Sequence, residues 1–441
     1  MMRNLDLDRS LLTHPFIEPR KTKVFGSQEV VEGQGIKIKL SDGRELIDGL
    51  SGLWNINVGH GRQEMAEAAN KQMKKLPYYP SAFEYTTEPS IKLAQKLSKL
   101  LPKKSGINRF TFGLTGSDAN ETAFRLARMY HTVRGEGKRK KIISRKYSYH
   151  GFTKAALSAT RIPLYHLWEQ PDPNLYFEVP PYDLDELEDL IIREGPKTIS
   201  VFIVEPIMAN GGVHIPPKDY LKVARRICDK YGVLMVFDEV ITAFGRTGKW
   251  FCMEHFDCYP DFISLSKGLT SGYLPLSATG ISSKVWNEIE DKTPPGLIFA
   301  NALTTGNHAT SCAVALANIE IIEKENLVNN SKEQGKYLLN QLKKQFKNNS
   351  MVKEIRGLGL MAGINWKNNR DAPKNYMGRK KILANRRYAD EYSIHFVAQC
   401  LKRGLIVRPV GPNTVIAPPL CTSKKEVDEI VSIMVESSKV T

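Results

Sequence analysis

Short apolar runs that alternate with helical patterns constrain the fold of this chain more than any other feature. Five such runs lie in the middle of the sequence, each bounded by turn residues: 109–114, 141–145, 199–206, 232–240 and 261–266. Helical periodicity occurs between several of them, for example over 119–130 and 219–231. Strands that alternate with helices in this way typically form parallel sheets. The sequence therefore predicts an α/β fold with a mostly parallel central sheet covered by helices.

The pattern changes after about Glu325. A lysine-rich amphipathic helix is predicted over 331–347, and a last helix opens at Thr422 or Ser423. Short strand-like segments lie between these two helices, at 352–357, 357–364, 405–410 and 415–418. We therefore expect a second, smaller α+β domain over residues 326–441.

The beginning of the chain contains hairpin-like material at 30–38 and 43–48. We expect this N-terminal segment, residues 1–60, to pack with the smaller C-terminal domain. Residues 61–325 then form the larger domain, which holds the central sheet.

The composition excludes several classes of protein. With 41% hydrophobic and 25% charged residues over 441 positions, the chain is typical of a globular protein. No stretch approaches the ~18 apolar residues that a membrane span needs, and the N-terminus does not resemble a signal peptide. The six cysteines form no CxxC pair, which argues against a zinc module or a disulfide scaffold. We expect reduced thiols, no metal, no membrane partner and a cytoplasmic location.

The positive net charge raises the question of an acidic partner. The chain has 63 Lys and Arg against 47 Asp and Glu, a formal charge of +16. Phosphate backbones favour clustered positive charge. The densest basic run, 138–141, follows two glycines and precedes an apolar strand, which is typical of a solvated loop. We therefore interpret the charge as surface charge and expect no nucleic-acid partner.

Two oppositely charged side chains follow strand-like runs. Asp238 lies near the end of the run 232–240, and Lys267 directly follows the run 261–266. Ligands of such sheets bind at the carboxyl ends of the strands, and neighbouring strands lie ~4.8 Å apart. Pyridoxal phosphate needs an acid at its pyridine nitrogen and an amine that forms a Schiff base, and these two residues can bracket its ring. Taken singly, Asp238 more often caps a turn, and Lys267 is usually a surface residue.

A turn between a strand and a helix offers a place for a phosphate. Thr115-Gly116-Ser117 leads into a helix that we expect Ser117 or Asp118 to cap, with Glu121 completing a capping box. Gly116 and Ser117 then present backbone N–H groups, a hydroxyl and the positive end of a helix dipole to an anion. An ordinary capped helix is the alternative. The segment matches neither GxxxxGK[ST] nor GxGxxG, which disfavours a nucleotide site.

Two more strand ends carry candidate ligands. Tyr149, in the triplet Tyr149-His150-Gly151, offers an aromatic face that can stack on a pyridine ring. Glu205, before Pro206, adds a second carboxylate at a strand end. The triplet alone is more often a packed turn. However, five candidate features lie at or just after strand ends, and it is improbable that each of them has a separate, purely structural explanation.

Together these motifs resemble one family over nearly the whole chain, the class III (omega) aminotransferases among the fold type I pyridoxal-phosphate enzymes. The resemblance rests on GSDAN (116–120), YHG (149–151), EP (205–206), DEVITAFGRTG (238–248), PDFISLSKGL (260–269), CAVALANI (312–319) and APPL (417–420). It implies fold type I, pyridoxal 5'-phosphate as cofactor and a homodimer with shared active sites.

The resemblance also implies roles for single residues. Lys267 forms the Schiff base and moves the proton between substrate and cofactor. Asp238 pairs with the pyridine nitrogen. Tyr149 stacks on one face of the ring and Val240 packs against the other. Glu205 belongs to the same cofactor site.

Phosphate binding is implied for Gly116 and Ser117 of one subunit and for Thr304 of the partner. The segment 301–307, NALTTGN, differs from the sequence motif that is usual in the amine:pyruvate branch. This difference leaves open whether Thr304 or Thr305 contacts the phosphate.

For the substrate, the resemblance implies a pocket lined by Trp54 and Phe83, and Arg408 as the group that binds a carboxylate. The alternative for Arg408 is an exposed position on an edge strand. We expect a ping-pong transaminase that moves an amino group from a primary amine or omega-amino acid to a small 2-oxo acid, with pyruvate as the expected acceptor. A taurine-type sulfonate donor, 2-oxoglutarate as acceptor, and an aminomutase or racemase reaction on the same fold stay open.

Overall fold

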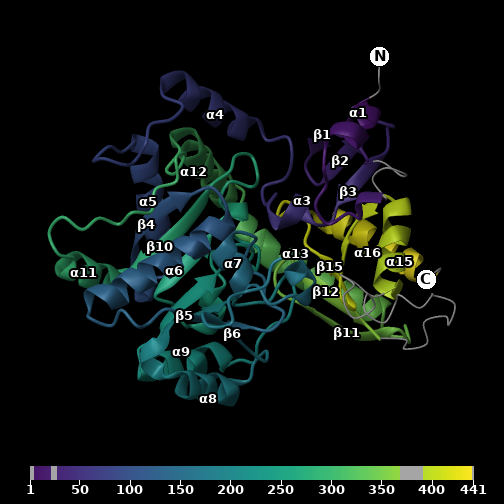
Figure 1. Ribbon diagram of the computed structural model, residues 1–441. Helices are drawn as coiled ribbons and strands as arrows, with labels where there is room; N and C mark the ends of the chain where they lie inside the picture. Colours follow the sequence, from purple (N-terminus) through teal and green to yellow (C-terminus); the bar gives the residue numbers. More distant parts are fainter. Residues whose placement is uncertain (1–3, 21–26, 368–390, 440–441) are drawn as a thin grey trace.

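A seven-stranded sheet forms the centre of the larger part of the protein in a computed structural model that describes residues 4–20, 27–367 and 391–439 (Figure 1). The strand order is β4-β10-β9-β8-β7-β5-β6. The strands are β4 (Ile107–Gly113), β5 (Lys141–Arg145), β6 (Tyr176–Val179), β7 (Ile199–Val204), β8 (Leu234–Asp238), β9 (Phe262–Leu265) and β10 (Ser277–Ser282). Neighbours from β6 to β9 pair in parallel, whereas β10 is antiparallel to β4 and β9. The predicted mostly parallel sheet is confirmed.

Helices cover both faces of this sheet. The helices of this part of the protein are α4 (Gln63–Lys75), α5 (Glu88–Leu100), α6 (Gly116–Val133), α7 (Lys154–Ala159), α8 (Leu184–Glu194), α9 (Tyr220–Tyr231), α10 (Met253–Phe256), α11 (Ser283–Lys292) and α12 (Ala309–Lys324). Among them, α4 packs on α12. Along β7, Val201 and Ile203 join a buried cluster with α6 and α11, while Phe202 and Val204 join the main core on the other side. Side chains of a strand alternate between its two faces, so both faces of the sheet are buried.

A smaller lobe combines the two ends of the chain (Figure 1). One sheet has the order β1-β2-β3-β13 and a second has the order β11-β12-β15-β14. Their strands are β1 (Val30–Gln34), β2 (Lys37–Leu40), β3 (Glu45–Asp48), β11 (Val352–Gly357), β12 (Ala362–Trp366), β13 (Leu405–Ile406), β14 (Arg408–Val410) and β15 (Asn413–Ile416). The parallel pairing of β3 with β13 joins the N-terminal hairpins directly to the C-terminal part.

The remaining helices surround these sheets or connect elements. They are α1 (Asn4–Leu11), α3 (Ser51–Trp54), α13 (Leu327–Gln345), α15 (Glu391–Lys402), α16 (Lys424–Ser438) and the 3-10 turns Lys103–Ser105, Pro163–His166, Pro196–Thr198 and Lys267–Leu269. Of the two predicted starts for the last helix, Ser423 is confirmed, because its hydroxyl and Glu426 form a capping box. No helix within the described ranges combines the length and apolar character needed to cross a bilayer.

The sequence did not predict strand β10, which inserts between β4 and β9. Its residues, SATGIS, are fully buried but form no apolar run. Gly280 explains part of this composition, because a Cβ there would lie 2.7 Å from the Ile263 side chain and 2.8 Å from that of Ile107. Small residues are therefore needed where this strand packs between its neighbours.

Candidate active site

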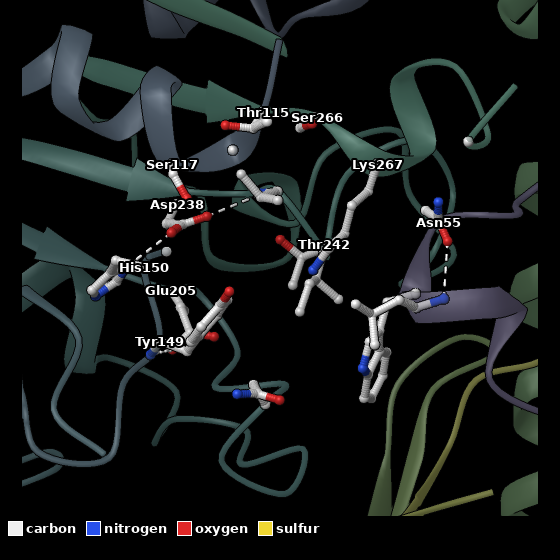
Figure 2. Close-up of a pocket in the computed structure, with 18 of the residues that line it drawn as sticks. Asn55, Thr115, Ser117, Tyr149, His150, Glu205, Asp238, Thr242, Ser266 and Lys267 are labelled. Atoms are coloured by element: carbon white, nitrogen blue, oxygen red, sulfur yellow. Dashed lines mark hydrogen bonds and ion pairs between the residues drawn. The ribbon is translucent and has the colours of Figure 1, made fainter. Parts of the chain in front are cut away.

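A cavity of about 400 Å³ lies at the carboxyl ends of the parallel strands (Figure 2). Glu205, Asp238 and Lys267, which follow or end β7, β8 and β9, form part of its wall. Trp54 and Arg408 reach the same cavity from the N- and C-terminal parts of the chain. The cavity is thus formed where the larger part of the protein meets the smaller lobe.

Asp238 is fixed by three donors. Its Oδ2 accepts hydrogen bonds from Asn120 Nδ2 and His150 Nδ1, both at 2.8 Å, and its Oδ1 accepts one from the Val240 N–H at 3.1 Å. The side chain is buried. A buried carboxylate is costly unless its oxygens are bonded, so these contacts both stabilise Asp238 and set its orientation.

Asn120 and His150 both bond Asp238, and neither was given a role from the sequence although both lie in its motifs. Asn120 also donates to the His150 carbonyl at 2.8 Å, and the His150 N–H donates to Thr160 Oγ1 at 2.8 Å. Among the described residues, His150 Nε2 is buried without a partner. Asn120 lies one turn into α6, and its side chain reaches Asp238 at the end of β8.

Lys267 begins the 3-10 turn after β9 with a left-handed φ of 46°. Such a backbone is strained for a residue with a Cβ and is found mainly where function requires it. Burial lowers the pKa of the Lys267 amine to about 8, against the opposing effect of the Asp238 and Glu205 carboxylates. Figure 2 shows Lys267 and Asp238 extending into one cavity from neighbouring strands. A larger share of neutral amine makes Lys267 a better nucleophile near neutral pH.

Glu205 has a different environment from Asp238. Its Oε1 accepts a hydrogen bond from the Tyr149 N–H at 3.0 Å. Burial, together with the nearby Asp238 carboxylate, raises the pKa of Glu205 to about 7 against the opposing effect of His150. Glu205 therefore positions the Tyr149 backbone and changes its charge near neutral pH.

The candidate phosphate turn begins the helix α6 two or three residues earlier than predicted. Thr115 is the cap: its Oγ1 accepts from the Asp118 N–H at 3.3 Å, and its N–H donates to Asp118 Oδ2 at 2.7 Å. The prediction that Ser117 or Asp118 caps this helix is wrong, because Asp118 instead completes the box at its third position. Gly116 and Ser117 become the first helical residues and line the cavity. Backbone N–H groups in a first helical turn have no partner within the helix.

Aromatic rings form a second wall. The Tyr149 ring lies 5.5 Å from that of Phe152 and 6.0 Å from that of Tyr165, measured between centroids. Phe16, from the N-terminal segment, contacts the Phe152 and Tyr165 rings at 5.7 and 5.6 Å. The Arg408 guanidinium lies 5.6 Å from the centroid of Phe16, within cation–π distance. Sequence reasoning missed Phe16 and Tyr165, for which no motif was available.

Trp54 presents an unusual group to this region. It is 1% exposed, has a φ of 65° and lines the cavity. Its indole Nε1 is buried and has no acceptor within the described residues. Leaving a buried donor unpaired costs about 1–3 kcal/mol, so the burial of this N–H is unfavourable in the described structure.

Nine of the predicted site residues line the cavity: Trp54, Gly116, Ser117, Tyr149, Glu205, Asp238, Val240, Lys267 and Arg408. Phe83 and Thr304 do not line it. The Phe83 side chain is 88% exposed, and Thr304 is exposed as well, with its carbonyl accepting a hydrogen bond from the Tyr78 hydroxyl. Within one chain, the structure therefore brings the strand-end residues together, whereas Phe83 and Thr304 lie outside the cavity.

Known proteins resemble the chain over almost its full length. The family model for Aminotransferase class-III matches residues 18–437. A diaminobutyrate–2-oxoglutarate transaminase of Halomonas elongata is 36% identical, covering 91% of this chain and 88% of its own. A taurine–pyruvate aminotransferase of Bilophila wadsworthia is 32% identical, and the match covers 97% of this chain and 94% of the relative. The crystal structure of an omega transaminase from Pseudomonas jessenii in complex with PMP is 31% identical, with a TM-score of 0.92 and coverage of 100% and 98%.

Proposed function

Because the chain belongs to the class-III aminotransferase family, it is a pyridoxal-phosphate enzyme of fold type I, and we propose that it transfers an amino group from a primary amine or omega-amino acid to pyruvate. One observation carries this proposal: Lys267 and Asp238 extend from neighbouring strands into a cavity that Arg408 also lines. An amine, an acid and a cation in one cavity match the needs of the cofactor and of an acidic substrate.

The residues present fit pyridoxal phosphate. Asp238 offers a bonded carboxylate to a protonated ring nitrogen, and Tyr149 and Val240 offer apolar surface to the two ring faces. The first turn of α6, at Gly116 and Ser117, offers N–H groups to the phosphate. We propose these roles for the five residues, and Lys267 as the covalent attachment point.

When bound, the cofactor supplies an electron sink for the carbanion character that develops at the substrate carbon. The chain supplies the proton transfers. The Lys267 amine, with a pKa lowered to about 8, is poised to take and return a proton near neutral pH. Asp238 holds a proton at the ring nitrogen, and Asn120 and His150 keep Asp238 in place.

The charges that the cavity offers favour a substrate with an acidic group. Both of its carboxylates are engaged, Asp238 by its three donors and Glu205 by the Tyr149 N–H. Arg408 lines the cavity and supplies the donors of its guanidinium. A carboxylate suits these donors, and a sulfonate suits them equally, so a taurine-type donor is the second candidate.

A donor panel tests the proposed reaction. The purified holoenzyme is supplied with an omega-amino acid, taurine, a simple primary amine and a diamine, each with pyruvate or 2-oxoglutarate. We expect the omega-amino acid with pyruvate to give the highest kcat/KM and the diamine the lowest. Faster reaction with 2-oxoglutarate would overturn the choice of acceptor. Turnover of a donor without consumption of any 2-oxo acid would identify an aminomutase or racemase instead.

We also propose a homodimer whose sites are shared. Thr304 and Phe83, exposed in the single chain, would then complete the phosphate and substrate sites of the partner. The loops that carry them lie together, since Asn307 Nδ2 and Ser81 Oγ are hydrogen bonded. Several large apolar side chains of these loops and the preceding segment are exposed: Tyr85, Leu297, Ile298 and Leu303. Exposed apolar clusters of this kind mark interaction surfaces.

Light scattering checks the dimer directly. We expect a mass about twice the 49.7 kDa of one chain, because a two-fold dimer is the commonest way in which such a surface is buried. A Phe83→Asp variant should shift the mass toward one chain and reduce cofactor affinity together. A monomeric wild-type protein with full activity would contradict the proposal.

The proposed domain division follows the ranges 1–60, 61–325 and 326–441. The β3–β13 pairing supports the association of the first and last ranges.

All six cysteines, each within the described residues, are unpaired thiols. This supports the proposal of a reducing, cytoplasmic location.

Close packing beside the proposed phosphate site gives a prediction for Gly151. Its φ is +131°, and a Cβ there would lie 2.2 Å from Ser117 Oγ. Gly151→Ala is therefore expected to displace the start of α6 and raise the Kd for pyridoxal phosphate by about 10-fold or more, given the 1–3 kcal/mol cost of such strain. Titration of the apoenzyme with the cofactor measures this. Gly137→Ala is a matched control, because its nearest neighbour would lie 3.9 Å away; equal Kd values for the two variants would contradict the prediction.

A further inference from the structure

Arg246 is a buried arginine that joins three distant parts of the chain. It lies in the loop after β8 and is fully buried. Its Nη1 donates to the Leu360 carbonyl at 2.9 Å and to the Pro418 carbonyl at 2.6 Å. Its Nη2 donates to Ser51 Oγ at 3.1 Å and to Asn57 Oδ1 at 2.8 Å. One guanidinium thus connects the loop after β8, the C-terminal part of the chain and the N-terminal segment.

The acceptors around Arg246 are all neutral. Burial lowers its pKa to about 9, and the charge of the more distant Asp48 offsets this only in part. Removing a guanidinium from water is expensive, and a buried charge is weak evidence for stability. An apolar side chain would fill this position at lower cost. The presence of Arg246 is therefore better explained by what its hydrogen bonds hold in place.

The bonds of Arg246 fix both ends of the segment 51–57. Ser51 and Asn57 lie on either side of Trp54 and Asn55, which line the cavity. The segment has left-handed φ values at Ser51 (52°), Gly52 (62°) and Trp54 (65°). Such backbone persists only where the surroundings hold it. Arg246 is part of that restraint.

Asn57 also contacts the turn that carries Lys267. A Cβ at Gly268 would lie 2.4 Å from Asn57 Nδ2, so the two residues are in close contact. The same Nδ2 donates to the Phe244 carbonyl at 2.9 Å, two residues before Arg246. A shift of Asn57 therefore changes both the Trp54 wall and the space beside the Lys267 turn.

We propose that Arg246 is a positioning residue of the substrate pocket, which holds the strained segment 51–57, and with it the Trp54 wall, against the turn of Lys267. Arg246 does not line the cavity, and its effect on catalysis passes through Ser51 and Asn57. The kinetic part of this proposal rests on the proposed transaminase function, whereas the structural part does not.

Arg246→Met keeps an unbranched stem but removes the guanidinium and with it the hydrogen bonds. We expect kcat/KM to fall by about 10- to 100-fold, since a misplacement of about 1 Å can cost about 10²-fold. Most of the loss should appear in KM, because the proposed contacts of the cofactor with Asp238 and α6 are unchanged. The Kd for pyridoxal phosphate should stay within about 2-fold of the wild-type value, well below the tenfold that 1.4 kcal/mol represents.

Hydrogen exchange gives a readout that is independent of activity. In Arg246→Met, amides of residues 50–58 should exchange faster than in the wild type, because the segment loses its restraint. Arg246→Lys should show a smaller increase, since an ammonium retains the charge but not the planar fork of donors. Ser51→Ala removes one acceptor and should also give a smaller increase, which keeps the test available if Arg246→Met does not fold.

Arg139→Met is the matched control. Arg139 is buried and donates to the carbonyls of Pro196, Ile199 and Tyr231, near the amino ends of the parallel strands and away from the cavity. We expect it to lower Tm as Arg246→Met does, but to leave KM and the exchange of residues 50–58 unchanged. If Arg246→Met lowered Tm and left both quantities at wild-type values, Arg246 would be merely structural. A wild-type protein that binds cofactor but does not transaminate would refute the proposed function, while the exchange experiment would still decide on Arg246.

Discussion

Lys267→Ala is expected to produce a folded protein that binds pyridoxal phosphate without a covalent bond and transaminates at least about 10⁴-fold more slowly. The variant loses both the nucleophile that attaches the cofactor and the base that moves the substrate proton, and proton transfer alone contributes about 10²–10⁴-fold. Asp238 and Glu205, the carboxylates that oppose the burial effect on the Lys267 amine, are both engaged by other donors. Neither can replace the amine, because a carboxylate does not form a Schiff base.

Two measurements check this prediction. Borohydride reduction followed by mass spectrometry should find the cofactor fixed to the peptide that contains Lys267 in the wild type, and no fixed cofactor in the variant. Covalent attachment to the apoenzyme should increase with pH and reach half its maximal rate near pH 8, because the neutral amine is the nucleophile and its pKa is lowered to about 8. Attachment that reached half its maximal rate near the ordinary lysine value of 10.5 would contradict the burial argument.

The stability of the apoenzyme provides a control, because the direction in which Lys267→Ala changes it can be predicted. The folded-state pKa of Lys267 lies below its unfolded value, so the buried charge destabilises the apoenzyme below about pH 8, and this penalty is relieved as pH rises toward 10.5. At pH 7 the Lys267→Ala apoenzyme should therefore be at least as stable as the wild type. Lys284→Ala, at an exposed position of α11, should change neither stability nor activity. An inactive Lys267→Ala protein that was also unfolded would leave the catalytic role unsupported.

The main sheet and its functional edge were predictable because parallel strands leave a strong sequence signal. Strands buried on both faces, such as β7 and β8, appear as continuous apolar runs. The residues directly after such runs meet at one edge of the sheet. This reasoning places Glu205, Asp238 and Lys267 together without knowledge of the strand order, and the structure confirms it.

Other parts of the site had no local signal. The three donors to Asp238 come from a helix, a loop and its own strand end, and no spacing rule connects them. Trp54 and Arg408 reach the cavity because the β3–β13 pairing brings the two ends of the chain together. That pairing involves four residues, too few to predict from a pattern. The prediction of Trp54 and Arg408 as site residues depended on the resemblance to a family.

The cap of α6 shows a limit of local rules. Ser117 and Asp118 are both good cap residues, and so is Thr115. Thr115 has extended backbone angles and is the cap, and Asp118 then bonds back to the Thr115 N–H and also accepts from Ser277 Oγ at 2.6 Å. Strand β10, which carries Ser277, has no clear sequence signal. The choice among three possible caps was thus made by tertiary contact.

Asp238→Asn is expected to lower kcat by about 10³-fold while leaving the protein folded. The negative charge that favours a proton on the ring nitrogen is lost, and electrostatic contributions of this kind reach about 10²–10³-fold. Asparagine has the same shape, and its oxygen can still accept from the Val240 N–H. Its amide nitrogen would face the donors of Asn120 and His150. A change of His150 tautomer turns Nδ1 into an acceptor, and Asn120 Nδ2 keeps the His150 carbonyl as its remaining acceptor.

A cofactor analogue separates the charge of Asp238 from its structural role. An N-methylated pyridoxal phosphate carries a permanent positive charge on the ring and needs no proton from the protein. It should recover at least about 10-fold of the rate lost in Asp238→Asn, because the missing electrostatic effect is then supplied by the ligand. Asn120→Ala is the matched control: it removes one donor to Asp238 and keeps the charge, so we expect a loss of only about 10-fold and no recovery with the analogue. If Asp238→Asn kept kcat within about 3-fold of the wild type, well below that electrostatic contribution, Asp238 would not be the partner of the ring nitrogen.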